Sequence, residues 1–237
     1  MCAHAIGEFV DSRTTTLAAH VDGNLTLFGP VPLAVRIGRQ KVSMSWYVWT
    51  RGRGDDRNSA LVLRASGRNG PYPKVRVHSA CQTGDVFASQ RCDCGAQLRE
   101  ALQRIASNGV GCLLYLGAQE GRGIGLFHKA MAYAVQQQYD LDTVDANEAL
   151  SCPVDGRSYA EAGLVLRHLI EEPVILMTNN PSKARGLKQA GVNILALEPL
   201  WAPPTAENRL YLETKVRRLG HLPGGQVVVS PDPTSHP

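Results

Sequence analysis

The chain has 237 residues, of which 43% are hydrophobic and 19% charged, and its formal net charge is +4. This composition supports a full hydrophobic core and excludes a largely disordered chain. No apolar run approaches the roughly 18–20 residues that a membrane span needs. The opening stretch MCAHAIGEFVDSRTTT has neither the basic nor the apolar region of a secretory signal. We therefore expect a cytoplasmic protein with no membrane partner.

Much of the positive charge lies between residues 36 and 68, in a stretch that looks β-rich. Nucleic-acid-binding surfaces usually interleave basic side chains with aromatic ones that stack on bases. Aromatic residues make up only 6% of this chain and do not alternate with the basic ones. We interpret the basic stretch as a solvated face and expect no nucleic-acid partner.

The hydrophobic pattern changes once along the chain. Residues 1–24 show no clear period, and we expect them to be poorly ordered. Residues 25–78 contain short β-branched and aromatic runs separated by turn residues, which predicts antiparallel strands. Beyond Cys94 helical and strand patterns alternate, which predicts a mostly parallel sheet covered by helices. The expected strands are 42–49, 60–64, 74–78, 110–116, 174–177 and 192–197, and the expected helices are 98–108, 124–138, 159–170, 181–189 and 207–219.

These elements predict an α/β fold in which helices flank a mixed sheet. Its N-terminal part is antiparallel and β-rich, and alternating βα units follow. We expect one domain over residues 25–222. The Pro- and Gly-rich residues 223–237 are expected to form a disordered tail.

Three of the six cysteines form a C-x10-C-x-C pattern in a polar stretch: Cys81, Cys92 and Cys94. Zinc prefers thiolate ligands in a tetrahedral arrangement. No fourth cysteine lies nearby, so the fourth position could hold water, which zinc makes nucleophilic near neutral pH. The alternatives are a structural zinc site completed by His78 or a remote side chain, and three thiols without a metal. We expect the other cysteines to be core residues or unliganded thiols.

A glycine-rich segment, QEGRGIG, follows the expected strand 110–116 and precedes a helix. Glycines at such a position let backbone N–H groups approach an anion, and the helix N-terminus favours negative charge. Glu120 in this segment is unsuited to phosphate. Its carboxylate could accept hydrogen bonds from the Watson–Crick edge of guanine, or it could cap the helix.

Two more motifs lie in turns of the C-terminal half. Asp155 and Arg157 could act as a base and a phosphate clamp in one cleft, or form an ion pair within the turn. Thr178 and Lys183 follow the strand 174–177, at the end where parallel sheets bind ligands. Their hydroxyl and ammonium groups suit a polyphosphate, although the segment could also be an ordinary capped connection.

The order of these motifs resembles that of the GTP cyclohydrolase II family. The matching segments are RVHSxCxTGDxFxSxRCDCGxQL, QEGRGIGL with a downstream AY, DTVxAN, DxR and TNNPxK, then YLETK and GHL. They cover residues 74–222. The resemblance implies a homodimer that opens the imidazole ring of GTP and releases formate and pyrophosphate. The remaining product, 2,5-diamino-6-(ribosylamino)pyrimidinone 5′-phosphate, enters riboflavin biosynthesis.

The resemblance also implies roles for individual residues. Zn²⁺ would be held by the three cysteines, and Mg²⁺ would accompany the polyphosphate. Asp155 would accept a proton, and Tyr133 would assist ring opening. Arg157 matches the arginine at the α-phosphate; a guanidinium stays protonated, so we expect it to clamp charge rather than attack. The residues implied to bind the nucleotide are Arg76, Val77, His78, Ser79, Ala80, Gln97, Glu120, Gly121, Arg122, Thr143, Thr178 and Lys183.

The chain departs from the family pattern at two positions. Ala80 stands where the family usually has glutamate, and the stretch around Gly117 lacks the arginine that usually precedes QEGR. Each lost charge-assisted contact is worth about 1.5–3 kcal/mol. Two alternatives therefore stay open. One is a relative that opens another purine nucleotide or stops at the formylated intermediate, and the other is a non-catalytic, zinc-stabilised nucleotide-binding protein.

Overall fold

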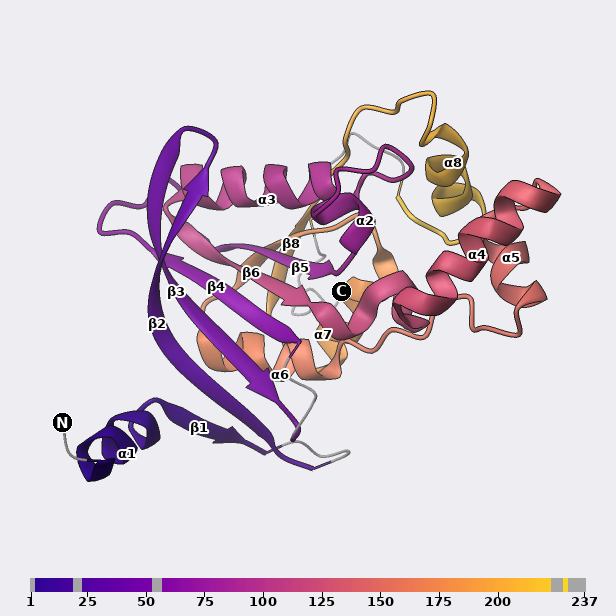
Figure 1. The fold of residues 1–237 in the computed structure, drawn as a ribbon. Coiled ribbons are helices and arrows are strands. Elements are labelled where there is room, and N and C mark those ends of the chain that lie inside the picture. Colours follow the sequence, from indigo (N-terminus) through magenta and orange to yellow (C-terminus); the bar gives the residue numbers. More distant parts are fainter. Residues whose placement is uncertain (1–2, 19–22, 53–56, 223–227, 230–237) are drawn as a thin grey trace, which may run out of the picture.

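The computed structural model describes residues 3–18, 23–52, 57–222 and 228–229. Within these ranges one mixed sheet has the strand order β1-β2-β3-β4-β6-β5-β7-β8-β9 (Figure 1). The pairs from β1 to β6 are antiparallel, whereas β6, β5, β7 and β8 run parallel. The predicted α/β fold, antiparallel first and then parallel with helices, is confirmed. The strands are β1 (Thr14–Leu17), β2 (Leu25–Ile37), β3 (Gln40–Thr50), β4 (Asn58–Arg64), β5 (Lys74–Ser79), β6 (Val110–Leu116), β7 (Val174–Met177), β8 (Ile194–Glu198) and β9 (Val228–Val229).

Helices cover both faces of the sheet (Figure 1). On one face α3 packs Ala101 and Ile105 against β6, and on the other α6 and α7 pack Val165 and Leu187. The central strand β6, VGCLLYL, is buried at every position but Tyr115, because both of its faces are covered. The helical segments are α1 (Ala3–Asp11), α2 (Gln82–Asp85), α3 (Cys94–Asn108), η1 (Gly117–Gly123, a 3-10 helix), α4 (Gly125–Tyr139), α5 (Thr143–Ala149), α6 (Ala160–Leu169), α7 (Pro181–Gln189) and α8 (Arg209–Arg217).

Local signals fix several helix ends where the sequence predicted them. Helix α3 ends at Gly109, whose φ of 76° is the left-handed conformation that glycine adopts at little cost. Helix α7 begins with Pro181, and the Asn180 side chain accepts hydrogen bonds from the backbone N–H groups of Ser182 and Lys183. Helix α7 has the predicted bounds.

Three parts of the chain differ in detail from the sequence-based expectations. In the N-terminal segment the structure has helix α1 and strand β1, whose Thr14 pairs with Phe28 of β2. Helices α2 and α5 were not predicted, because four and seven residues are too few to show a helical period. Of the expected tail, only Val228–Val229 is described; it pairs with β8 as β9, and the other tail residues lie outside the described ranges.

The parallel strands end at a common edge of the sheet. Strands β5, β6 and β7 finish there at Ser79, Leu116 and Met177, and α2, α4, α5 and α8 gather beside them (Figure 1). Carboxyl ends of parallel strands are the usual place for a ligand in such folds. Among the helices of the described ranges, none has the length and apolar character needed to cross a bilayer.

Candidate active site

A cavity opens at the carboxyl ends of β5, β6 and β7. It encloses about 1040 Å³, counting its open mouth. The predicted site residues line it with two exceptions. Val77 lies in the core and reaches the site only through its carbonyl oxygen, which accepts a hydrogen bond from Lys183. Asp155 does not line the cavity but accepts hydrogen bonds from Arg157, which does. The fold thus brings together motifs that are separated by more than 100 residues.

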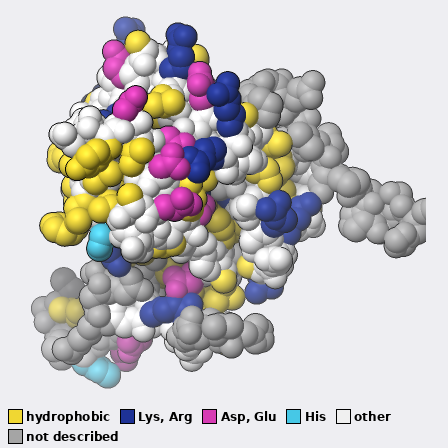
Figure 2. Space-filling model, turned by 90° about the vertical axis from the view of Figure 1, so that its right-hand side faces the viewer, with side chains coloured by type: hydrophobic (Ala, Val, Ile, Leu, Met, Phe, Trp, Pro, Cys, Tyr) yellow, Lys and Arg dark blue, Asp and Glu magenta, His cyan; other side chains and the backbone are white. Residues whose placement is uncertain are grey.

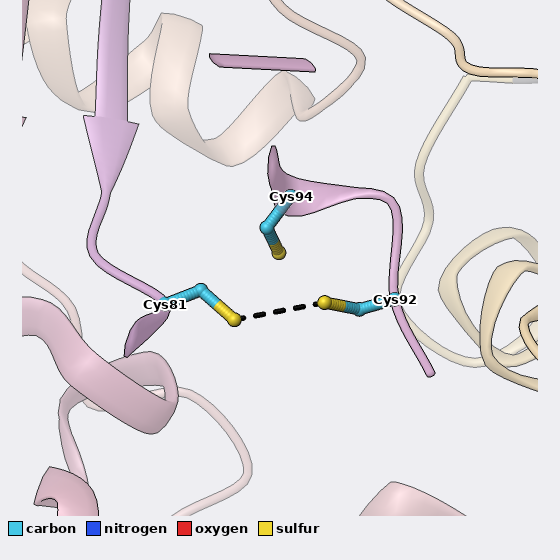
Figure 3. A group of neighbouring side chains, drawn as sticks. All are labelled: Cys81, Cys92 and Cys94. Carbon is cyan, nitrogen blue, oxygen red and sulfur yellow. Dashed lines mark hydrogen bonds between the residues drawn. The ribbon is translucent and has the colours of Figure 1, made fainter. Parts of the chain in front are cut away.

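The three cysteines of the C-x10-C-x-C pattern converge on one wall of this cavity (Figure 3). Cys81 follows β5, whereas Cys92 and Cys94 lie at the start of α3. Their sulfur atoms lie within 4.8 Å of one another, and the Sγ atoms of Cys81 and Cys92 are 3.6 Å apart. Tetrahedral zinc with bonds of about 2.3 Å separates its sulfur ligands by roughly 3.8 Å. The three thiols therefore fit a single zinc ion.

His78, a candidate fourth ligand from the sequence, does not belong to this group within the described residues. Its Nε2 lies 3.1 Å from both carboxylate oxygens of Asp85. The Asp85 carboxylate also accepts hydrogen bonds from the backbone N–H of Cys81 and the hydroxyl of Tyr115. His78 thus helps hold the segment that carries Cys81.

The pKa values of Cys81 and Cys92 are shifted in opposite directions. Hydrogen bonds from Cys92 and Cys94 lower the pKa of Cys81, and the positive charge of Lys129 adds to this effect. The bond to Cys81 raises the pKa of Cys92 to about 11. The ammonium of Lys129 thus favours a thiolate in this cluster, and a metal ion would replace the protons that remain on the cysteines.

Lys129 is a site residue that the sequence analysis missed. Its Nζ lies 3.2 Å from the Sγ of Cys81 and 2.7 Å from Oε1 of Glu120. Burial lowers the pKa of Lys129, but the charges of Cys81 and Glu120 outweigh it and raise the pKa above its ordinary value. Lys129 lies one helical turn before Tyr133 on α4, and residues four apart share a face of a helix. Because Tyr133 was expected at the site, Lys129 could have been expected there too.

Glu120 faces the cavity, and within the described residues its carboxylate accepts no hydrogen bond from the backbone N–H groups of α4, the helix that it could have capped. The carboxylate lines the cavity, as a guanine-binding group must. It accepts hydrogen bonds from Lys129, from the backbone N–H of its neighbour Gly121 and, at 2.7 Å, from the backbone N–H of Gln82 at the start of α2. A carboxylate has about four acceptor sites, so these bonds leave capacity for a ligand.

Arg122 combines a strained backbone with an unpaired side chain. Its φ of 62° is left-handed, as are those of its neighbours Gly121 and Gly123. Both of its terminal nitrogens, Nη1 and Nη2, are buried and have no hydrogen-bond acceptor among the described residues. Strained residues cluster at ligand sites, and a buried guanidinium needs an acceptor. Arg122 is thus poised to bind an anionic oxygen from the cavity.

Asp155 and Arg157 form an ion pair within the turn, as one interpretation of the sequence expected. Burial raises the pKa of Asp155, but hydrogen bonds from Arg157 outweigh it and hold the pKa below its usual range. The Asp155 carboxylate is therefore ionised at neutral pH. The pair does not exclude the other interpretation, since Arg157 faces the cavity and the carboxylate is free of a proton.

Thr178 and Lys183 are both buried in the cavity wall. The connection between them is an ordinary capped one, in which the Thr178 hydroxyl accepts a hydrogen bond from the N–H of Asn180. Burial, with the nearby charge of Arg76, lowers the pKa of Lys183 well below its ordinary value. An anionic ligand would oppose that effect by favouring the charged ammonium.

The two departures from the family pattern lie in different surroundings. A Cβ atom at Gly117 would lie only 2.3 Å from the carbonyl oxygen of Arg57, so this backbone has no room for a side chain. Ala80 lines the cavity beside Cys81, and its side chain offers no polar atom there. The loss of the usual glutamate therefore changes the cavity wall itself.

The segment that follows β8 contributes four side chains that were given no role from the sequence: Trp201, Tyr211, Lys215 and His221. The motif YLETK, which contains Tyr211 and Lys215, had matched the family pattern. That match could have identified Tyr211 and Lys215 as site residues, although nothing in the sequence placed them near the cysteines.

Three thiols and several cationic side chains, one of them the unpaired guanidinium of Arg122, in one cavity are typical of a metal-dependent enzyme that acts on an anionic substrate. The family model described as GTP cyclohydrolase II matches residues 17–199. The chain belongs to this family, which confirms the resemblance found in the sequence motifs.

Similar proteins carry names from riboflavin biosynthesis. The chain is 53% identical over 150 residues to the rice protein named probable bifunctional riboflavin biosynthesis protein RIBA 2, chloroplastic, covering 63% of this chain and 27% of that protein. It is 53% identical over 176 residues to the riboflavin biosynthesis protein RibBA of Bacillus velezensis, covering 74% of this chain and 44% of that protein. The chain thus spans less than half the length of these relatives.

Proposed function

We propose that this chain hydrolyses the imidazole ring of GTP, releases formate and pyrophosphate, and leaves 2,5-diamino-6-(ribosylamino)pyrimidinone 5′-phosphate. The observation that carries the proposal is that the three-cysteine group and the unpaired guanidinium of Arg122 face the same cavity. Hydrolysis of a nucleotide needs both a group that activates water and cations that hold the phosphates.

In this proposal Cys81, Cys92 and Cys94 hold a zinc ion. Bound zinc would supply Lewis acidity, which permits hydrolysis at neutral pH. Three thiolates carry more negative charge than the ion neutralises, and the Lys129 ammonium, 3.2 Å from Cys81, offsets the excess. The same ammonium also keeps Glu120 at the cavity wall.

The side chains around the cavity support a division of roles. Arg122 and Arg157 are cations suited to a polyphosphate, with which we expect Mg²⁺, and a bound polyphosphate would favour the charged form of Lys183. The ionised Asp155 can accept a proton. Tyr133 lies close to two cations, with its ring centroid 4.5 Å from Arg91 Cζ and 5.6 Å from Lys129 Nζ. Burial raises the pKa of Tyr133, so its hydroxyl stays protonated and can donate a hydrogen bond to the opening ring.

We also propose that the enzyme is a homodimer. Large apolar side chains are exposed on α4 and just after α2, among them Phe127 at 75% and Phe87 at 68%. Figure 2 looks at the side of the molecule where α4, α5 and α8 lie, and hydrophobic side chains gather at one edge of it. A second copy of the chain would remove this surface from water.

Ala80 supports a second candidate. Because the cavity wall lacks the usual carboxylate beside Cys81, the enzyme could open a different purine nucleotide or stop at the formylated pyrimidine. The two candidates share the metal site and differ in the mass of the product.

Replacement of one cysteine tests the metal assignment. Cys92→Ser should lose zinc and formate release together, because two thiolates bind zinc far more weakly than three. Cys152→Ser is the matched control, since Cys152 is a half-buried thiol outside the cluster. Formate release by Cys92→Ser at the rate of the unchanged protein would overturn the assignment.

A further inference from the structure

The C-terminal helix α8 reaches the cysteine cluster through one buried ion pair. Lys215 of α8 is only 8% exposed, and its Nζ lies 2.5 Å from Oδ1 of Asp93. Asp93 is the residue between Cys92 and Cys94, and its side chain is fully buried. The pair joins residues 122 positions apart. Lys215 also lies beyond residue 199, where the match to the family model ends.

The carboxylate of Asp93 does not cap the helix that Asp93 begins. Asp93 is the N-cap residue of α3, where an aspartate normally accepts hydrogen bonds from the first N–H groups of its own helix. No such side-chain cap is formed here. One oxygen instead pairs with Lys215, and the other accepts a hydrogen bond of 2.6 Å from Nε2 of Gln97. The orientation of the carboxylate is thus set by α8 and not by the helix that it begins.

The same network continues to the centre of the sheet. The Gln97 side-chain oxygen accepts a bond of 2.6 Å from Nη2 of Arg76, and Nη1 of Arg76 donates to the carbonyl of Met177 at the end of β7. Arg76, Gln97, Asp93 and Lys215 are all buried. Buried, hydrogen-bonded charges of this kind rigidify the segments that they join. The turn from Cys92 to Cys94 is therefore held by α8 through Lys215 and by the sheet through Gln97 and Arg76.

We propose that Lys215 is a positioning residue of the metal site, which acts through Asp93 to hold the sulfur atoms of Cys92 and Cys94 toward Cys81. This inference rests on the proposed zinc site. Without Lys215 the buried Asp93 carboxylate would lack its ion-pair partner between two metal-binding cysteines, and the turn would have to open to expose it to water. Residues that orient metal ligands typically change metal affinity by about 10–100-fold when they are replaced.

The experiment measures metal binding by the full chain, without substrate. Zinc affinity is obtained by competition with a chromophoric chelator, and the geometry of the site by the absorption bands of Co²⁺ bound in its place. The variants are Lys215→Met, Asp93→Asn, both together, and Lys215→Arg, which keeps the charge. Arg217→Met is the matched control, because it removes a positive charge from the exposed side of the same helix.

We expect Lys215→Met and Asp93→Asn each to weaken zinc binding by about 10–100-fold and to alter the Co²⁺ bands. The double variant should be no weaker than the worse single one, because both remove the same pair. Lys215→Arg should recover much of the affinity, and Arg217→Met should bind like the unchanged protein.

If the ion pair between Lys215 and Asp93 only anchors α8, the experiment will give a different result. Lys215→Met would then melt at a lower temperature yet retain the zinc affinity and Co²⁺ bands of the unchanged protein, which would overturn the proposal. Should Lys215→Met fail to fold, unaltered zinc affinity in Asp93→Asn overturns it equally. Failure of the unchanged protein to bind zinc contradicts the proposed function itself, so the two failures are distinguishable.

Discussion

Asp155 and Arg157 form a two-point ion pair in which Nε of the arginine lies 2.8 Å from Oδ1 and Nη2 lies 2.5 Å from Oδ2. Only Gly156 separates the two residues. The pair fixes the guanidinium in the cavity wall and keeps the carboxylate ionised. A single turn thereby places a cation in the cavity wall and an ionised carboxylate in direct contact with it.

Replacement of Asp155 tests its proposed role as a general base. Asp155→Asn should slow formate release by about 10²–10⁴-fold, the usual contribution of a positioned general base. The fold should be retained, as judged by circular dichroism. Glu172→Gln is the control, because Glu172 pairs with Arg68 on the exposed surface. Turnover of Asp155→Asn close to that of the unchanged protein would refute the role.

Glu120→Gln tests whether the carboxylate recognises guanine. If it accepts hydrogen bonds from the base, the preference for GTP over ATP in kcat/KM should fall roughly tenfold or more, since a bond to a charged group contributes about 1.5–3 kcal/mol. An unchanged preference would leave Glu120 with a structural role only, as the acceptor of hydrogen bonds from Lys129, Gln82 and Gly121.

Gly84 is predicted to be necessary for the cysteine cluster. A Cβ atom at this position would lie 2.9 Å from the Sγ of Cys92 and 3.3 Å from that of Cys81. Gly84→Ala should therefore push the sulfurs apart and lower the zinc content of the purified protein. Gly52→Ala is the matched control, because a Cβ there meets nothing within 4 Å. Equal zinc content in the two variants would contradict the prediction.

His221 should make stability depend on pH. Burial lowers the pKa of His221 to about 3, and the positive charges of Lys215 and Arg157 add to this. Because the folded pKa lies below the unfolded value of about 6.5, the contribution of the neutral ring is complete above that value and is lost as pH falls toward 3.

Urea unfolding of the unchanged protein and of His221→Asn, from about pH 7 to about pH 4, measures this contribution. The free energy of unfolding of the unchanged protein should fall more steeply with decreasing pH than that of the variant. Parallel curves would show that His221 is protonated as readily in the folded chain as in the unfolded one.

The sequence predicted the elements whose signals are local. The apolar run of β6, the stripe of α3 that ends at Gly109, and the Asn-Pro start of α7 each depend on residues within one element. Strand β1 escaped prediction because its four residues have one buried side chain, Leu17, and depend on pairing with β2. Such pairing leaves no periodic trace in so short a stretch.

Site residues could be predicted where their type and spacing in the sequence already indicate a chemical role. Three cysteines in a polar stretch have no packing reason to be there, so Cys81, Cys92 and Cys94 stood out. Lys129 and Lys215 did not, because a lysine on a helix is usually solvated. Their roles come from burial against Glu120 and Asp93, which only the fold brings near.

The most direct test of the proposed function is to identify the products. The zinc-loaded protein would be incubated with GTP and Mg²⁺, the pyrimidine product weighed by mass spectrometry, and formate and pyrophosphate assayed in parallel. We predict all three: formate, pyrophosphate and the diaminopyrimidinone monophosphate. A product that retains the formyl group would favour the second candidate, and absence of any ring opening by zinc-loaded protein that binds GTP would contradict the proposed reaction.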